Sequence, residues 1–307
     1  MNTFVGEYRA PAAEPLDMGL LAALPTLPLR SRYLASSFLA GRHRSPWKGQ
    51  SVDFVESRAY QLGDEPRRID WRYYARTDRL TVRVFEHDSQ LRVYLVLDTS
   101  KSMAWRSRNS VLTKLDYARV VLASLAVLAR RQQDAVGLVL ADESDPVFLK
   151  HSSSPAHLQA IFARLDLAKS SGRLDFAATG EQVSRLVPPR SLIVWAGDFY
   201  EDLEVVRATL QRLRYDGHDV LGIQVLDPAE VDFDISTDGV FFDVESGFGL
   251  PVSTESARKS YLENFQAFER SLQGTFYDEA CDLAVLRTDQ APSGALAAFL
   301  ARRDHAG

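Results

Sequence analysis

Short apolar runs that alternate with amphipathic segments dominate the chain from residue 91 onward. We expect strands at 91–97, 136–140, 147–149, 192–196, 220–225, 239–244 and 283–286. We expect helices at 114–132, 155–167, 174–186, 203–213, 256–272 and 294–303, where apolar positions recur at helical spacing. Strands bounded by helices of this length are typical of a mostly parallel sheet covered on both faces. The pattern therefore predicts an α/β fold, with a doubly wound sheet over residues 91–307.

The N-terminal third follows a different pattern. Residues 16–41 carry apolar positions at helical spacing, interrupted by Pro25 and Pro28, which predicts two short helices. Residues 50–90 favour short strands and loops. We expect three parts, namely a flexible arm (1–15), a small mixed N-terminal domain (16–90) and the sheet domain (91–307).

The composition excludes several classes of protein. Apolar residues make up 46% and charged residues 25% of the chain, which rules out a disordered, collagenous or coiled-coil protein. A single cysteine, Cys281, allows no intrachain disulfide and favours a reducing compartment. The most apolar run, 120–129, is half of the roughly 20 residues that a membrane span needs, and no signal peptide is visible. These features predict a cytoplasmic protein without a membrane span.

The charge is unevenly distributed along the chain. The net charge of −5 argues against binding of nucleic acid, but residues 30–83 hold 12 Lys and Arg against 6 Asp and Glu. These arginines either pair with neighbouring carboxylates and fasten the N-terminal domain to the sheet, or they form a docking face for an acidic partner. In the first interpretation Trp71 and Tyr60 are buried beside them.

Oxygen-bearing side chains follow two of the predicted strands. Asp98, Ser100 and Ser102 come directly after the strand at 91–97, and Asp198 follows the strand at 192–196. The carboxyl ends of parallel strands meet at one edge of a sheet, where open α/β folds bind their ligands. Carboxylate and hydroxyl oxygens suit a hard cation such as Mg²⁺. The alternative is that these residues only cap the helices that follow.

The pattern of Asp98, Ser100, Ser102 and Asp198 resembles the metal-ion-dependent adhesion site of von Willebrand factor A domains. The upstream segment is similar to the signature of the bacterial domain-of-unknown-function family fifty-eight, whose members are usually encoded beside MoxR-type AAA+ ATPases. The signature positions include Arg58, Asp64, Arg68, Asp70, Trp71 and Arg76. The resemblance implies Mg²⁺, Mn²⁺ or Ca²⁺ as cofactor, and a MoxR-type ATPase and a client protein as partners.

One position departs from the adhesion-site pattern. Leu174 stands where a threonine ligand is expected, in the stretch 172–175. Leucine cannot ligate a cation, so Asp175 and Thr179 are the candidate substitute ligands, although Thr179 is expected one turn into a helix.

No nucleophile, general base or phosphate-loop motif is visible in the sequence. We therefore expect a non-enzymatic adaptor or co-chaperone that binds a partner's carboxylate through the metal site. Two alternatives stay open: a metal-assisted phosphate-ester hydrolase that uses Asp98 and Asp198, and a structural scaffold whose metal site is dead.

Overall fold

A six-stranded sheet forms the centre of the molecule. The computed structural model describes residues 18–42, 54–59, 71–85, 91–141, 147–233, 239–242, 249–252 and 254–292. The strand order is β10-β7-β6-β3-β4-β5, and only β5 at the edge runs antiparallel to its neighbour. The strands are β3 (Arg92–Asp98), β4 (Ala135–Ala141), β5 (Val147–Ser152), β6 (Leu192–Gly197), β7 (Asp219–Leu226) and β10 (Asp282–Arg287). The expected α/β class with a doubly wound, mostly parallel sheet is confirmed.

The central strands are apolar along their whole length because both of their faces are covered. In β3 every residue after Arg92 is buried, and β4 and β6 are buried throughout. The register pairs Leu97 of β3 with Ala196 of β6. The residues that follow these two strands therefore emerge side by side at the same edge of the sheet.

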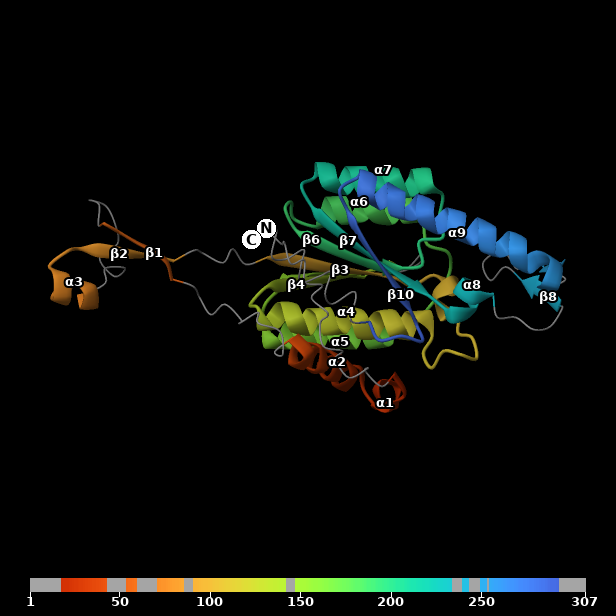
Figure 1. Ribbon diagram of the computed structural model, residues 1–307, viewed down its shortest axis with the longest axis horizontal. Coiled ribbons are helices and arrows are strands. Elements are labelled where there is room, and N and C mark those ends of the chain that lie inside the picture. The colour runs from red at the N-terminus through yellow and green to blue at the C-terminus, as the bar shows by residue number, and fades with distance from the viewer. Residues whose placement is uncertain are drawn as a thin grey trace, which may run out of the picture.

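Helices cover the sheet in two layers (Figure 1). One face carries α4 (Lys114–Arg131) and α5 (Pro155–Leu167), and the other carries α6 (Phe176–Leu186), α7 (Leu203–Tyr215) and α9 (Thr254–Asp278). Each layer encloses its own cluster of buried apolar side chains. The short helix α8 (Pro228–Asp232) and the 3-10 helix η2 (Lys101–Ala104) lie at the carboxyl edge of the sheet.

Helix α4 is buried on nearly every side, although the sequence pattern assigned it a single apolar face. Its outer surface is covered by α2 (Leu27–Arg42), and α1 (Met18–Ala23) packs on α2. Leu21, Leu27 and Leu34 of these helices join the apolar cluster of α4 and the sheet. The two N-terminal helices therefore contribute to the core of the sheet domain, whereas the sequence grouped them with the short strands.

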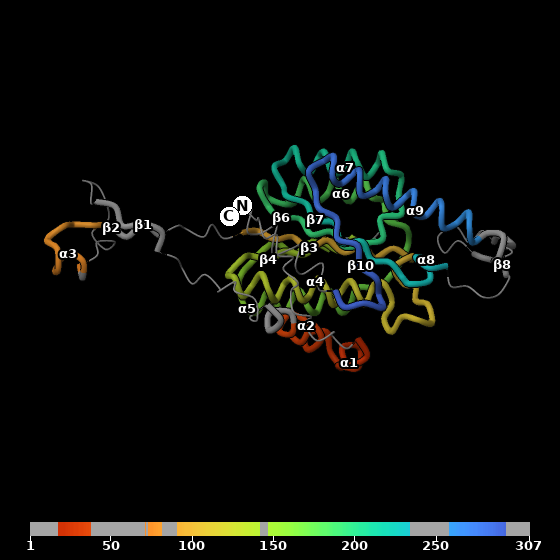
Figure 2. The backbone as a smooth tube through the Cα atoms, viewed as in Figure 1, coloured from red at the N-terminus to blue at the C-terminus, as the bar shows by residue number. Residues whose placement is uncertain are grey.

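The short strands of the signature region form a separate antiparallel pair. β1 (Phe54–Ala59) pairs with β2 (Thr81–Phe85), and α3 (Trp71–Thr77) lies between them in the sequence; Figure 1 draws all three apart from the sheet, and Figure 2 shows α3 there in orange. Trp71 is 58% exposed, so the expectation that it is buried is wrong. Its ring lies 6.2 Å from that of Tyr74 between ring centres, with the two ring planes at 90°. Asp64, Arg68, Asp70 and Tyr60 lie outside the described residues.

The expected strand at 239–244 is present as β8 (Gly239–Phe242), but it pairs with β9 (Gly249–Val252) in a hairpin separate from the main sheet. The expected arm (1–15) and last helix (294–303) lie outside the described residues. Among the helices that the structure describes, none is both long and apolar enough to cross a membrane.

Candidate metal centre

Asp98 ends β3 and begins a tightly held loop. It is 2% exposed, and its Oδ1 accepts a hydrogen bond from the Ser100 backbone N–H at 2.8 Å. The Ser100 and Ser102 hydroxyl oxygens lie 3.0 Å apart. The Thr99 hydroxyl donates to the Ala141 carbonyl at 2.8 Å and so fastens the loop to the end of β4. The spacing of two residues between the three oxygen-bearing side chains therefore gathers them at one point.

Asp198 follows β6 and lies beside Asp98 because Gly197 leaves room for it. A Cβ atom on Gly197 would lie 2.9 Å from both Cβ and Oδ2 of Asp98, closer than such contacts normally come. Phe199, buried and with φ 57°, takes the left-handed backbone conformation that few residues other than glycine adopt. A bulky residue in this conformation turns the chain directly after Asp198, at the edge where the two carboxylates meet.

A hollow of about 300 Å³ opens above the two carboxylates. All four predicted ligands line it, and Leu174 lines it as well. The remaining lining residues are Arg173, Phe176, Phe199, Tyr200 and Glu201. The structure thus brings the four predicted ligands together in one cavity, with Leu174 at the position where the adhesion-site pattern has threonine.

The two carboxylates titrate differently because their surroundings differ. Burial, and then the charge of Asp198, raise the pKa of Asp98 to about 7. Burial also raises the pKa of Asp198, but the Lys114 ammonium and a hydrogen bond from Ser102 outweigh it and hold the pKa below its usual value. At neutral pH the pair therefore carries between one and two negative charges.

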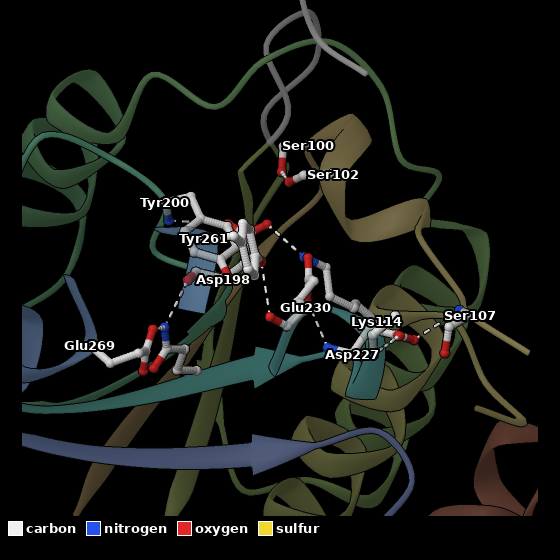
Figure 3. Close-up of polar contacts among 12 residues, drawn as sticks. Ser100, Ser102, Ser107, Lys114, Asp198, Tyr200, Asp227, Glu230, Tyr261 and Glu269 are labelled. Carbon is white, nitrogen blue, oxygen red and sulfur yellow. Dashed lines mark hydrogen bonds and ion pairs between the residues drawn. The ribbon is translucent and has the colours of Figure 1, made fainter. Parts of the chain in front are cut away.

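Lys114, the first residue of α4, supplies a positive charge inside the site. Its side chain is fully buried, and Nζ lies 3.0 Å from Asp198 Oδ2 and 2.7 Å from Glu230 Oε1 (Figure 3). Burial alone would lower the pKa of Lys114, but the two carboxylates raise it. The ammonium also lies 5.4 Å from the centre of the Tyr200 ring, within the range of a cation–π contact.

Glu230 on α8 completes a chain of polar contacts behind Lys114. Its Oε2 accepts from the Asp227 backbone N–H at 2.7 Å, and its own carbonyl accepts from the Tyr261 hydroxyl at 2.9 Å (Figure 3). Asp227 in turn accepts from the Ser107 backbone N–H at 2.9 Å. The Lys114 ammonium therefore lies between the buried Asp198 carboxylate and the partly buried Glu230 carboxylate, which backbone contacts hold in place.

The donor set fits a hard divalent cation, but with few charged ligands. Two carboxylates and two hydroxyls offer oxygen atoms, which Mg²⁺ and Mn²⁺ accept readily. Within the described ranges, no three side chains from His, Cys, Asp and Glu group closely enough to hold a metal ion. Binding therefore depends on Ser100 and Ser102 as well as on Asp98 and Asp198.

The two candidate substitute ligands do not reach this cavity. The Asp175 carboxylate caps α6, where its Oδ1 accepts from the Ala178 backbone N–H at 2.9 Å. Thr179 lies inside α6 and lines a neighbouring hollow of about 820 Å³ along α6 and α7. Asp175 and Thr179 are therefore wrong as replacements for the threonine, because helix formation directs both elsewhere.

Two of the signature arginines lie in described elements. Arg58 is part of β1, and Arg76 is exposed in the last turn of α3. Figure 1 shows α3 apart from the sheet edge that carries Asp98 and Asp198. The signature helix is therefore a separate feature from the metal centre.

Lys114, Glu230 and Tyr200 were missed by the sequence interpretation. One signal pointed to Lys114: a cation in the first turn of a helix opposes the helix dipole, and Lys114 follows directly on the helix cap Thr113. Such a position calls for a nearby carboxylate. No local sequence signal identified Glu230, since it lies more than a hundred residues along the chain.

The family described as "Protein of unknown function DUF58" matches residues 56–270. Two curated relatives are the uncharacterised proteins Rv1480 of Mycobacterium tuberculosis and Mb1516 of Mycobacterium bovis. Each is 28% identical to this chain over 291 residues, which cover 94% of this chain and 90% of the relative. The match therefore spans the sheet domain and the signature region together.

Solved structures of similar fold include an aerotolerance-related membrane protein from Bacteroides fragilis. It is 15% identical, with a TM-score of 0.49, over 70% of this chain and 99% of that one. BatB from Bacteroides thetaiotaomicron is 14% identical, with a TM-score of 0.44, over 70% and 99%. A von Willebrand factor type A protein from Catenulispora acidiphila is 11% identical, with a TM-score of 0.42, over 74% and 43%. This likeness concerns the fold alone.

Proposed function

Because the chain belongs to the DUF58 family and its mostly parallel α/β sheet resembles that of von Willebrand factor A domains, we propose that it is a non-enzymatic adaptor that binds a partner protein. The contact is made at the carboxyl edge of the sheet. Asp98, Ser100, Ser102 and Asp198 hold a divalent cation there. When bound, the cation offers a positive site to a carboxylate of the partner.

One observation carries this proposal: the four oxygen-bearing side chains line a single open cavity although they come from two separate parts of the chain. A capping role alone does not account for them. The 3-10 helix after Ser100 has no side-chain cap hydrogen bond, and α7 is capped by Asp202, not by Asp198. Capping of the following helices therefore does not explain why these four side chains converge on one cavity.

Each side chain has a separate task in this proposal. Asp98, which is buried at the end of β3, supplies a negative charge, and its pKa of about 7 makes that charge sensitive to pH. Ser100 and Ser102 add neutral oxygen atoms on one side. Asp198 closes the other side, held in place by Lys114 and by the Tyr200 backbone N–H.

The neighbouring hollow gives the partner a further surface. It shares Arg173, Leu174, Phe176 and Glu201 with the metal cavity and continues along α6. Its charged residues are of both signs, with Arg173 and Arg185 near Glu181 and Glu201. A mixed surface of this kind suits a specific protein better than a uniformly charged polymer.

The partner that we propose is a MoxR-type AAA+ ATPase, with which this chain acts as adaptor or co-chaperone toward a client protein. The proposal rests on family membership and on the signature residues, of which Arg76 is exposed.

Affinity purification from the native cell tests the proposal. We expect the wild-type chain to retain the ATPase in Mg²⁺ and to lose it in EDTA. Asp98→Ala should lose it in both buffers, whereas Asp166→Ala, an exposed carboxylate on α5, should behave as wild type. Recovery of the ATPase that is indifferent to EDTA and to Asp98→Ala would contradict the role of the metal.

A metal-free scaffold is the second candidate, and two observations favour it. Leu174 offers no oxygen at the threonine position, and Lys114 already balances part of the charge on Asp198. A scaffold binds its partner equally well in EDTA, so the same purification separates the two candidates. A phosphatase screen with Mg²⁺ and Mn²⁺ tests the hydrolase alternative. Lys101 is the cationic side chain next to Ser100 and Ser102, but it is exposed and does not line the cavity, so it is poorly placed to act as a general acid there.

A further inference from the structure

Lys114 contacts one of the proposed metal ligands, so its positive charge would act on a bound metal ion at short range. The Asp198 Oδ2 accepts a hydrogen bond from the Lys114 Nζ at 3.0 Å (Figure 3), and Asp198 also lines the cavity. The side chain cannot withdraw into solvent, because it is fully buried beneath Tyr200 and α8. The ammonium is therefore a permanent part of the site.

A fixed ammonium acts on a divalent cation in two ways. It repels the cation across a short distance in a medium of low dielectric constant, where charges interact more strongly than in water. It also occupies the Asp198 oxygen that would otherwise be free to accept the cation. Both effects lower the affinity of the site for metal.

The same ammonium stabilises the site when no metal is bound. Asp98 and Asp198 are both buried, and Glu230 lies behind them in a largely buried position. Buried carboxylates that lack a positive partner destabilise a folded protein. Lys114 compensates part of that charge without any metal.

We propose that Lys114 is an internal cation that competes with the divalent metal for Asp198 and sets the metal affinity of the site. This inference rests on the proposed function, since it concerns the occupancy of the same cavity. The site is thereby charge-compensated in two states, one with the ammonium alone and one with metal added. Partner binding is then controlled by the concentration of the divalent cation.

The experiment is a calorimetric titration of Mn²⁺ into the full chain, with melting curves in EDTA and in excess Mn²⁺. Lys114→Met keeps an unbranched side chain only one atom shorter and removes its charge. We expect Lys114→Met to bind Mn²⁺ more tightly than wild type by about tenfold or more. We also expect its Tm to fall in EDTA and to recover in Mn²⁺ more than that of wild type.

A charge-conserving variant separates local competition from net charge. Lys114→Met combined with Glu230→Gln removes one charge of each sign, so the net charge of the region is unchanged. The double variant also avoids leaving the Glu230 carboxylate without its positive partner. It therefore serves as the main variant if Lys114→Met does not fold. Tight binding by this double variant supports competition at Asp198, and wild-type affinity overturns it.

Lys101→Met is the matched control. Lys101 lies between Ser100 and Ser102 in the sequence, but it is exposed and does not line the cavity. We expect its affinity for Mn²⁺ to stay close to that of wild type. Equal Mn²⁺ affinity in wild type and both Lys114 variants overturns the role of Lys114 and leaves the proposed metal site standing. No Mn²⁺ binding in any variant overturns the proposed metal site as well.

Discussion

Asp98 and Asp198 are both aspartates in one cavity, yet their surroundings shift their pKa values in opposite directions. Asp198 has the Lys114 ammonium at 3.0 Å, and Asp98 has mainly burial and the neighbouring carboxylate. Asp98 is therefore the carboxyl group that gains or loses a proton near neutral pH, whereas Asp198 stays ionised.

The raised pKa of Asp98 predicts how the stability of the metal-free protein, measured in EDTA, changes with pH. In the folded protein it is about 7 and in the unfolded chain it is near 3.8, so the folded state binds more protons between these values. The contribution of Asp98 to stability is therefore lost as the pH rises from about 4 to about 7. It amounts to roughly 1 kcal/mol for each unit of pKa shift.

Chemical denaturation of wild type and Asp98→Asn across this range measures the contribution. The stability of wild type relative to Asp98→Asn should decrease as the pH rises, because the asparagine does not titrate. Parallel profiles for the two proteins would mean that Asp98 ionises as it does in the unfolded chain.

Leu174 gives a second prediction at the scale of single residues. Since it lines the metal cavity, Leu174→Thr should place a hydroxyl there and tighten Mn²⁺ binding, by severalfold for one added neutral ligand. Leu174→Val is the matched control, because valine has the shape of threonine without its hydroxyl. If both variants bind Mn²⁺ equally, the hydroxyl does not reach the cation.

At the scale of elements, the meeting of β3 and β6 creates the site. Their parallel register aligns the residues that follow Leu97 and Ala196, and Gly197 lets the two strands end close together. This part was predictable from sequence, because apolar runs that end in polar residues mark the carboxyl edge of a parallel sheet. The contribution of α8 was not predictable, since Glu230 reaches the site through tertiary packing.

Gly197→Ala tests the close approach of the strands. Its Cβ would meet Asp98 at 2.9 Å, so we expect a loss of about 1–3 kcal/mol from overpacking, together with weaker metal binding. Gly274→Ala on α9 is the control, because apart from its chain neighbours and the nearby backbone of its own helix, no heavy atom of the described residues lies within 4 Å of the added Cβ. That change should be neutral or stabilise the helix by up to about 1 kcal/mol. Equal effects of the two substitutions on unfolding would contradict the role of Gly197.

At the scale of the whole molecule, the N-terminal helices belong to the core. The sequence identified α1 and α2 correctly as helices but did not show where they pack, because a short apolar face fits many partners. In the signature region, by contrast, the sequence predicted a buried contact that is absent. A tryptophan among arginines indicated a buried contact, and Trp71 is instead exposed.

Two alanine substitutions measure this difference. Leu34 is 2% exposed in the cluster with α4, so Leu34→Ala should lower the free energy of unfolding by about 2–5 kcal/mol. Trp71→Ala should change it by no more than about 0.5 kcal/mol, as expected for a surface position. A large loss of stability in Trp71→Ala would show that the ring is buried against another part of the chain.

The metal centre is the feature on which the proposed adaptor role depends, and diffraction tests it directly. Crystals of the full chain soaked in Mn²⁺ should give an anomalous difference peak in the cavity, within coordination distance of Asp98, Ser100 and Ser102. The same soak of Asp98→Ala crystals should give no peak there. A cavity without manganese at saturating concentration, or a peak away from these residues, would contradict the account.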